Sequence, residues 1–263
     1  MSRQRVPEGP APEPAVQKLR IRYAKRGRLR FSSTRDFQRA LERALRRADV
    51  PMAFSAGFHP HPKISYANAA PTGMGSEAEY VEISVTERVE PESVRLALDE
   101  ALPIGLDVLE VVEARPGALA DRLQASEWVL AFRDVTEAEL RAAAEIFLAL
   151  ETIEVTRTFK NGPRTFDVRS AVLAMTVASD EALRDTVPHA LPAGAPGCAT
   201  MRAVVRHTTP AVRPDDILTA LRAGSRLEPL TPPLVTRLAQ GPLLDATVGV
   251  ADPLAADERV GDS

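Results

Sequence analysis

The sequence predicts an α+β protein made of two ferredoxin-like halves with antiparallel sheets. Two blocks, residues 17–115 and 124–225, alternate strand-like runs of apolar residues with amphipathic helical segments. The first block has the order β-α-β-β-α-β, which is that of the split βαβ unit. The second block is a less regular copy, inferred from element order alone because no sequence identity between the blocks is visible. The proline-rich residues 1–16 and the acidic stretch 245–263 are predicted to be disordered tails.

In the first block, period-two alternation predicts strands and a 3.6-residue period predicts helices. The segment Ser33-Thr34-Arg35-Asp36 has the Ser-x-x-acid pattern of a helix start, and Pro91 suits the first turn of a second helix. The predicted elements are strand 19–24, helix 36–48, strand 62–67, strand 79–85, a helix from Pro91 through Leu102 and strand 106–112.

In the second block, Asn161-Gly162 lies between two extended runs and is a strong hairpin signal. The segment from Thr136 to Glu139 predicts a helix start, and Arg213-Pro214-Asp215-Asp216 leads into a helix through Leu221. The other predicted elements are strand 127–133, helix 136–150, strands 152–160 and 164–168, and strands 171–177 and 200–207.

Composition excludes several classes of protein. The single cysteine, Cys198, excludes an internal disulfide framework and a cysteine-only metal or iron–sulfur site. Aromatic residues make up only 5% of the 263 residues, which argues against a broad base-stacking platform. No apolar run has the length of a membrane span, and no apolar signal core begins the chain. We therefore expect a cytoplasmic protein without membrane association, cofactor or bound metal.

Positive charge is concentrated near the N-terminus. Twelve Lys and Arg residues lie between Lys18 and Arg47 against two acids, although the whole chain has a net charge of −3. This asymmetry indicates a surface that faces a polyanion. The alternative is an ordinary solvated helix face with intrahelical pairs such as Glu42–Arg46. The cationic candidates for phosphate binding in this segment are Arg28, Arg30, Arg39, Arg43 and Arg46.

A histidine–proline run, Gly57-Phe58-His59-Pro60-His61-Pro62-Lys63-Ile64-Ser65-Tyr66-Ala67, follows the basic segment. Proline holds the residue before it in an extended conformation, so His59 and His61 are both extended. If a strand begins at Lys63, the three side chains of His59, His61 and Lys63 project from one side. We interpret the run as a rigid cationic edge that binds a ligand, with Asp36 of the nearby helix start as a further candidate.

The segments 31–36, 57–67 and 70–73 resemble the radical SAM-linked family, a domain of unknown function, in its free-standing actinobacterial form. Phe166-Asp167-Val168-Arg169 and Val212-Arg213-Pro214-Asp215-Asp216 add to a resemblance that covers residues 18–225. The family usually has a histidine where this chain has Thr34, and a small polar residue where it has His59. In many bacteria the domain is fused to a radical SAM enzyme, which implies such an enzyme as partner.

Several functions fit these residues. The basic segment favours recognition of RNA, either tRNA or rRNA, by a protein without autonomous catalysis. The alternative is a metal-independent ribonuclease that uses His61 and Lys63. A metal site would require Asp36, Asp167, His189 or His207 to converge on the two histidines. A module that docks to a separate radical SAM enzyme is compatible with RNA binding. For Asp167 and Arg169, a buried ion pair is the simplest expectation.

Overall fold

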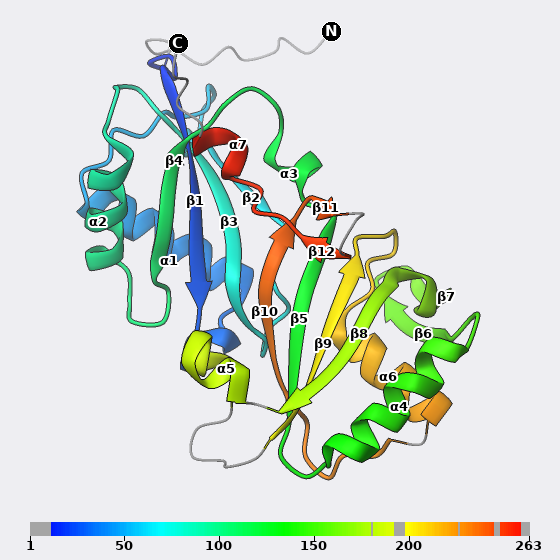
Figure 1. Ribbon diagram of the computed structural model, residues 1–263. Helices are drawn as coiled ribbons and strands as arrows, with labels where there is room; N and C mark the ends of the chain where they lie inside the picture. Colours follow the sequence, from blue (N-terminus) through cyan, green and yellow to red (C-terminus); the bar gives the residue numbers. More distant parts are fainter. Residues whose placement is uncertain (1–11, 180, 192–197, 226, 245–247, 259–263) are drawn as a thin grey trace, which may run out of the picture.

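One eight-stranded sheet runs through both blocks of the chain (Figure 1). The computed structural model describes residues 12–179, 181–191, 198–225, 227–244 and 248–258. The strands of the sheet are β1 (Gln17–Lys25), β2 (Ile64–Ala67), β3 (Gly75–Val85), β4 (Val108–Glu113), β5 (Ala125–Phe132), β8 (Val172–Ser179), β9 (Ala199–Arg206) and β10 (Leu234–Gly241). Their order is β4-β1-β3-β10-β5-β9-β8, and β2 pairs with β3. The fold is thus α+β with a mostly antiparallel sheet.

Helices, short turns and two hairpins complete the described fold. The helices are α1 (Thr34–Arg47), α2 (Pro91–Ala101), α3 (Leu119–Arg122), α4 (Glu137–Ala149), α5 (Glu181–Thr186), α6 (Pro214–Ser225) and α7 (Ala255–Glu258). The 3-10 turns are η1 (Gly27–Phe31), η2 (Arg169–Ala171) and η3 (Pro188–Ala190). The hairpins pair β6 (Glu154–Phe159) with β7 (Gly162–Asp167), and β11 (Leu243–Leu244) with β12 (Gly249–Val250).

The two blocks contribute adjoining parts of the sheet. In the first, β1 pairs antiparallel with β3 and β4, and β2 pairs antiparallel with β3. In the second, β5 lies between β10 and β9, and β8 follows β9, again antiparallel. The two parts meet where β3 and β10 run parallel, with Gly75 opposite Thr236. The sequence patterns predict no strand between residues 226 and 244, so β10 is an addition to the predicted sheet.

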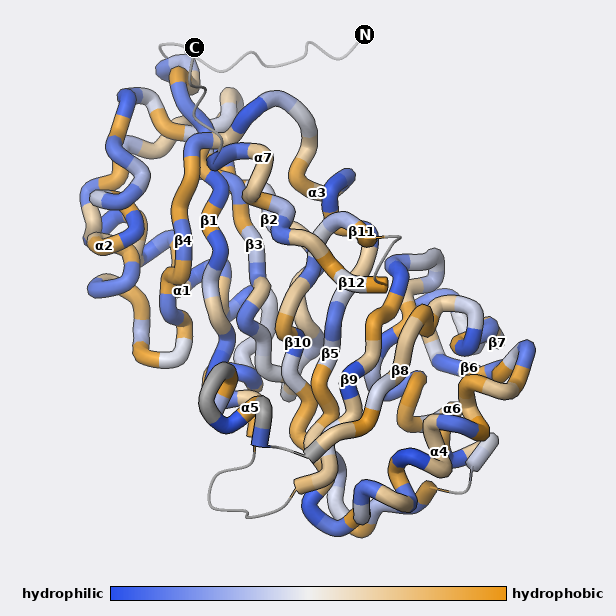
Figure 2. The backbone as a smooth tube through the Cα atoms, viewed as in Figure 1, coloured by the Kyte–Doolittle hydropathy of each residue, from blue (hydrophilic) through white to orange (hydrophobic). Residues whose placement is uncertain are grey.

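Each part of the sheet has its own apolar core. In the first block, Phe37 and Leu41 of α1 and Leu98 of α2 pack against Leu19 and Ile21 of β1. In the second block, α4 and α6 cover β5, β8 and β9 through a separate cluster. Figure 2 shows hydrophobic stretches along β4, β5 and β9, as expected for strands buried beneath helices. Among the described helices, none is both long and apolar enough to cross a bilayer.

Local signals in the sequence are confirmed at several element boundaries. Ser33 and Asp36 form a capping box at the start of α1, and Thr136 and Glu139 form one at the start of α4. Pro91 begins α2 as predicted. The predicted hairpin is present, but Phe159 pairs with Gly162, so the two loop residues are 160–161 and Gly162 takes the positive φ of +104°.

The described part of the C-terminal segment, residues 248–258, differs from the predicted disordered tail, whereas residues 245–247 and 259–263 lie outside the described part. Residues 249–250 form β12, and α7 packs its Asp257 side chain into a fully buried position. Charge pairing with basic residues of the sheet explains this order, because an acidic segment that finds buried cationic partners need not remain solvated. In the predicted N-terminal tail, residues 1–11 lie outside the described part, and residues 12–16 are exposed without regular structure.

Candidate functional site

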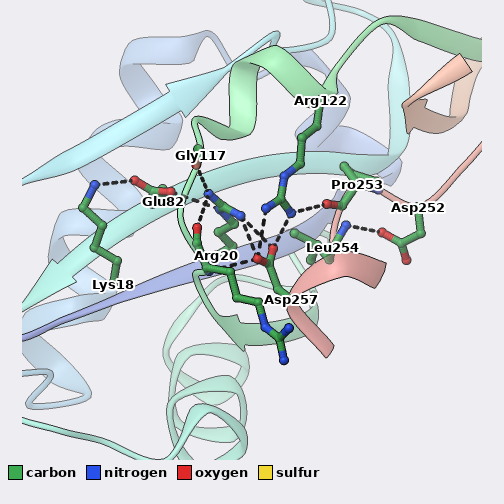
Figure 3. A network of polar contacts seen from close by, with 10 residues as sticks. Lys18, Arg20, Glu82, Gly117, Arg122, Asp252, Pro253, Leu254 and Asp257 are labelled. Atoms are coloured by element: carbon green, nitrogen blue, oxygen red, sulfur yellow. Dashed lines mark hydrogen bonds and ion pairs between the residues drawn. The ribbon is translucent and has the colours of Figure 1, made fainter. Parts of the chain in front are cut away.

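The basic segment is divided between structural and surface roles. Alternation along β1 places Leu19 and Ile21 against the helices, and Arg20 on the opposite face of the sheet. There, Arg20 is 1% exposed and donates to Asp257 at 2.8 Å, and it also pairs with Glu82 at 3.1 Å (Figure 3). Lys18 also pairs with Glu82, and Arg22 lies 3.9 Å from Asp252. The charges of these three cations are therefore paired with carboxylates, and only Arg20 is fully buried.

Helix α1 carries five arginines that form no ion pair with the described residues. Its buried stripe is Phe37, Leu41, Ala44 and Leu45. Among the described residues, no carboxylate forms an ion pair with the arginines outside this stripe, and the alternative pair Glu42–Arg46 is not formed. All five are exposed, and we call them the arginine face: Arg35, Arg39, Arg43, Arg46 and Arg47.

The histidine–proline run forms a narrow, exposed loop before β2. The Lys63 N–H donates to the Ala53 carbonyl at 2.8 Å, and the Ser55 N–H donates to the His61 carbonyl at 2.9 Å. The Ser55 hydroxyl accepts from the His61 N–H at 3.0 Å. These bonds fix the backbone while the side chains of His59, His61 and Lys63 remain exposed. We call residues 54–62 the His–Pro loop.

The His–Pro loop lies beside the C-terminal end of α1. A pocket of about 300 Å³ is lined by Arg46 and Asp49 from the helix end and by Phe54 and Pro62 from the loop. At the other end of α1, Phe37 makes an edge contact with Tyr66 of β2, with ring centroids 6.1 Å apart. Helix α1 and strand β2 therefore run alongside each other, and Arg46 borders the loop.

Asp36 has a structural role that differs from the predicted binding role. Its carboxylate accepts hydrogen bonds from the Ser33 hydroxyl at 2.7 Å and from the Ser33 N–H at 3.2 Å. Hydrogen bonds from Ser33 lower the pKa of Asp36 below its ordinary value. The carboxylate thus caps α1 and complements its N-terminal dipole.

A cleft of about 960 Å³ lies where the two halves of the sheet meet, and we call it the junction cleft. Its walls come from the end of β1, η1, the start of β3, the β5–α4 loop, the α5–η3 region and the start of β10. Figure 1 shows α5 beside the C-terminal end of β1. The basic and aromatic residues of its lining are Lys25, Arg26, Arg30, Phe31, Arg133, Arg184 and His189.

Only Arg30 of this cleft was among the predicted binding residues, and Arg28 is exposed on the same turn. Lys25 belongs to the basic segment that the sequence singles out. Arg133 was missed because it follows a strand more than a hundred residues further along the chain, and only the pairing of the strands brings it to the same cleft.

A buried charge network lies beneath the junction cleft. The Lys25 ammonium donates to the carbonyls of Ala70 at 3.1 Å and Pro71 at 3.4 Å. Arg237 of β10 pairs with Glu79 of β3, and its guanidinium lies 5.2 Å from the Trp128 ring centroid. Burial lowers the pKa of Lys25. Although burial opposes the ionisation of Glu79, nearby Arg237 and Ser76 hold the pKa of that carboxyl below its ordinary value. The network ties the two halves together across the β3–β10 pair.

A serine–histidine contact elsewhere does not form an accessible nucleophile. Ser126 Oγ lies 2.8 Å from His207 Nε2, and His207 Nδ1 lies 2.7 Å from the Leu123 carbonyl oxygen. Ser126 is 1% exposed, so a substrate cannot reach its hydroxyl. Burial lowers the pKa of His207. In the part of the chain that the structure describes, no group of three or more His, Cys, Asp or Glu side chains is arranged to hold a metal ion.

The expected ion pair between Asp167 and Arg169 is wrong. The Asp167 carboxylate accepts backbone N–H groups of Ile153, Arg169 and Ser170. The Arg169 guanidinium donates to the carbonyls of Val172 and Leu148. Backbone groups at the turn lie closer to both side chains than the two side chains do to each other. These residues fix η2.

The fold and the site together define a mixed α+β protein with an arginine-rich helix and a basic cleft at the centre of its sheet. A family model described as "Uncharacterized protein conserved in bacteria (DUF2344)" matches residues 18–214. The chain belongs to this family. Comparison with curated proteins finds no match.

Proposed function

We propose that this protein recognises RNA, either tRNA or rRNA, in connection with radical SAM-dependent modification and without catalysis of its own. The arginine face carries the proposal. Five exposed guanidinium groups follow one side of a 14-residue helix, and none is paired with a described carboxylate. Guanidinium groups bind phosphate oxygens through paired, charge-assisted hydrogen bonds, and such contacts supply most sequence-independent affinity for nucleic acids.

Cationic groups continue beyond both ends of α1. Arg28 and Arg30 of η1 precede its N-terminus, and Lys63 and the His–Pro loop lie toward its C-terminus. A helix of this length extends about 21 Å, enough to contact several phosphates of one strand. We therefore propose the arginine face, η1 and the His–Pro loop as one RNA-binding surface.

Two further features support the proposal. The strand orders β4-β1-β3-β2 and β10-β5-β9-β8 are consistent with two ferredoxin-like halves, an architecture that often binds RNA, although fold alone does not determine function. The resemblance to radical SAM-linked proteins supports a separate radical SAM enzyme as the partner. In this proposal the protein holds the RNA and the partner carries out the chemistry.

The test is retention of total bacterial RNA by the full chain, measured by filter binding between 50 and 200 mM salt. Charge reversal at Arg39, Arg43 and Arg46 to glutamate is expected to weaken binding by at least tenfold. It should also reduce the slope of log K against log salt by about 2, because each contact to a single strand contributes about 0.7. The surface position of all three residues leaves the core intact.

A matched control carries the same change in net charge. Reversal at Arg88, Arg141 and Arg222, which are exposed outside α1, should lower RNA affinity much less and preserve the salt slope. Equal losses in the two triple variants would show that only net charge matters. Absence of RNA retention by the wild type would contradict the proposal.

A further inference from the structure

The junction cleft has the size and lining of a small-ligand site. Its volume of about 960 Å³ lies near the upper end of the usual range of about 300–1,000 Å³. A lone inorganic phosphate would fill only a small part of this volume. The lining combines basic groups with the aromatic ring of Phe31.

Charge in the cleft favours an anion. Glu77 is the one acidic residue among the described lining residues, and Arg26 pairs with it and with Asp107. Arg30 and Arg133 form no ion pair with any described residue. Their charge is therefore available to a phosphate, which guanidinium groups bind in a paired geometry.

Phe31 presents an aromatic ring to this basic site. It is 59% exposed, so a ligand can reach its ring. The guanidinium of Arg30 lies over one face of this ring, 4.5 Å from its centroid. A Cβ atom at Gly73 would lie 3.7 Å from Cε1 of Phe31, and Gly73 has a φ of +93°. Glycine thus satisfies the backbone and leaves that edge of the ring uncovered.

We propose that the junction cleft binds one nucleotide, with its phosphate between Arg30 and Arg133 and its base stacked on Phe31. The nucleotide is either a free mononucleotide or one unit of the RNA bound at the arginine face. The second source rests on the proposed function, whereas the first does not. In either case the cleft adds a site that recognises the base, which the arginine face lacks.

The test is isothermal titration calorimetry of the full chain at low salt. The probes are the four ribonucleoside 5′-monophosphates, ribose 5-phosphate and inorganic phosphate. At least one mononucleotide should bind tighter than both probes that lack a base. Phe31→Ala should weaken that binding by about tenfold or more and leave ribose 5-phosphate binding unchanged. Phe31→Tyr should retain affinity, because it keeps the ring.

Changes at the phosphate end should act differently. Arg133→Gln is expected to weaken the mononucleotide and ribose 5-phosphate alike. Two variants on α4, outside the cleft, serve as controls. Ile146→Ala removes an exposed apolar group and Arg141→Gln removes a charge, and neither should change the affinity for the mononucleotide or for ribose 5-phosphate. The same variants are then tested for retention of total RNA, which identifies the source of the nucleotide.

The outcomes separate this inference from the proposed function. If Phe31→Ala weakens mononucleotide binding and the wild type retains no RNA, the ligand of the cleft is a free nucleotide and the RNA proposal is contradicted. A loss of both affinities in Phe31→Ala supports a nucleotide of the bound RNA. If no mononucleotide exceeds ribose 5-phosphate, and Phe31→Ala retains RNA fully, the cleft inference is overturned while the arginine face stands.

Discussion

Asp257 provides a stringent test of how the C-terminal segment is held. Its side chain is fully buried beneath β1, although it lies in a stretch whose composition predicts disorder. Its carboxylate accepts from Arg20 at 2.8 Å and from Arg122 at 2.7 Å (Figure 3). It also accepts from the Arg115 N–H at 2.9 Å. We expect Asp257→Ala to destabilise the protein severely.

The magnitude follows from what remains after the substitution. Arg20 is 1% exposed and would keep only Glu82 as a charged partner, while the Arg115 N–H would lose its acceptor. Removing one partner of a buried ion pair costs about 3–5 kcal/mol, because the other charge stays buried without that partner. Loss of an ordinary hydrogen bond alone would cost about 1 kcal/mol. The loss expected from a broken buried ion pair therefore exceeds the loss expected from one hydrogen bond by an amount that unfolding experiments can measure.

Urea unfolding followed by circular dichroism measures the free energy of unfolding. Asp121→Ala, at an exposed position on α3, is the control and should change it by less than about 0.5 kcal/mol. The double variant Arg20→Met with Asp257→Ala should cost clearly less than the sum of the single variants, since the buried charge of Arg20 is removed together with its partner. A loss below about 1 kcal/mol in Asp257→Ala would refute the reasoning.

Three other predictions concern the pH response, the junction and catalysis. Burial, with Glu258 and Asp252 nearby, raises the pKa of Glu110 to about 7, so its contribution to stability is full below about pH 4.5 and is lost as the pH rises through 7. Between pH 5 and 8 the free energy of unfolding of the wild type should fall by about 1–2 kcal/mol more than that of Glu110→Gln, after allowance for solvent screening. Equal decreases in the two proteins, measured by urea unfolding, would contradict this. Arg237→Met should lower the free energy of unfolding by about 3–5 kcal/mol because Glu79 remains buried, whereas a neutral effect would show that the β3–β10 junction does not depend on this pair. His61→Ala should leave every RNA cleavage pattern unchanged, and a reproducible cut that disappears in this variant would favour the ribonuclease alternative.

Local interactions account for what could be predicted from the sequence. The capping boxes at Ser33 and Thr136, the turn before Gly162 and the alternation along β1 involve residues a few positions apart. Their geometry depends on backbone preferences and side chains within the same segment. For the same reason helical spacing alone predicted that the arginine face lies outside the buried stripe of α1. The prolines of the His–Pro loop likewise predicted an extended backbone at His59 and His61.

The sequence by itself therefore determined most of the element types, the mixed α+β class and the face of α1 that carries the arginines. Only the tertiary structure decided which cations are neutralised, because Arg20 meets Asp257 and Arg26 meets Glu77 across long separations in sequence. It also decided that β10 joins the two halves and that Phe31, Arg30 and Arg133 share one cleft. Such contacts depend on strand order and sheet pairing, which no local pattern specifies.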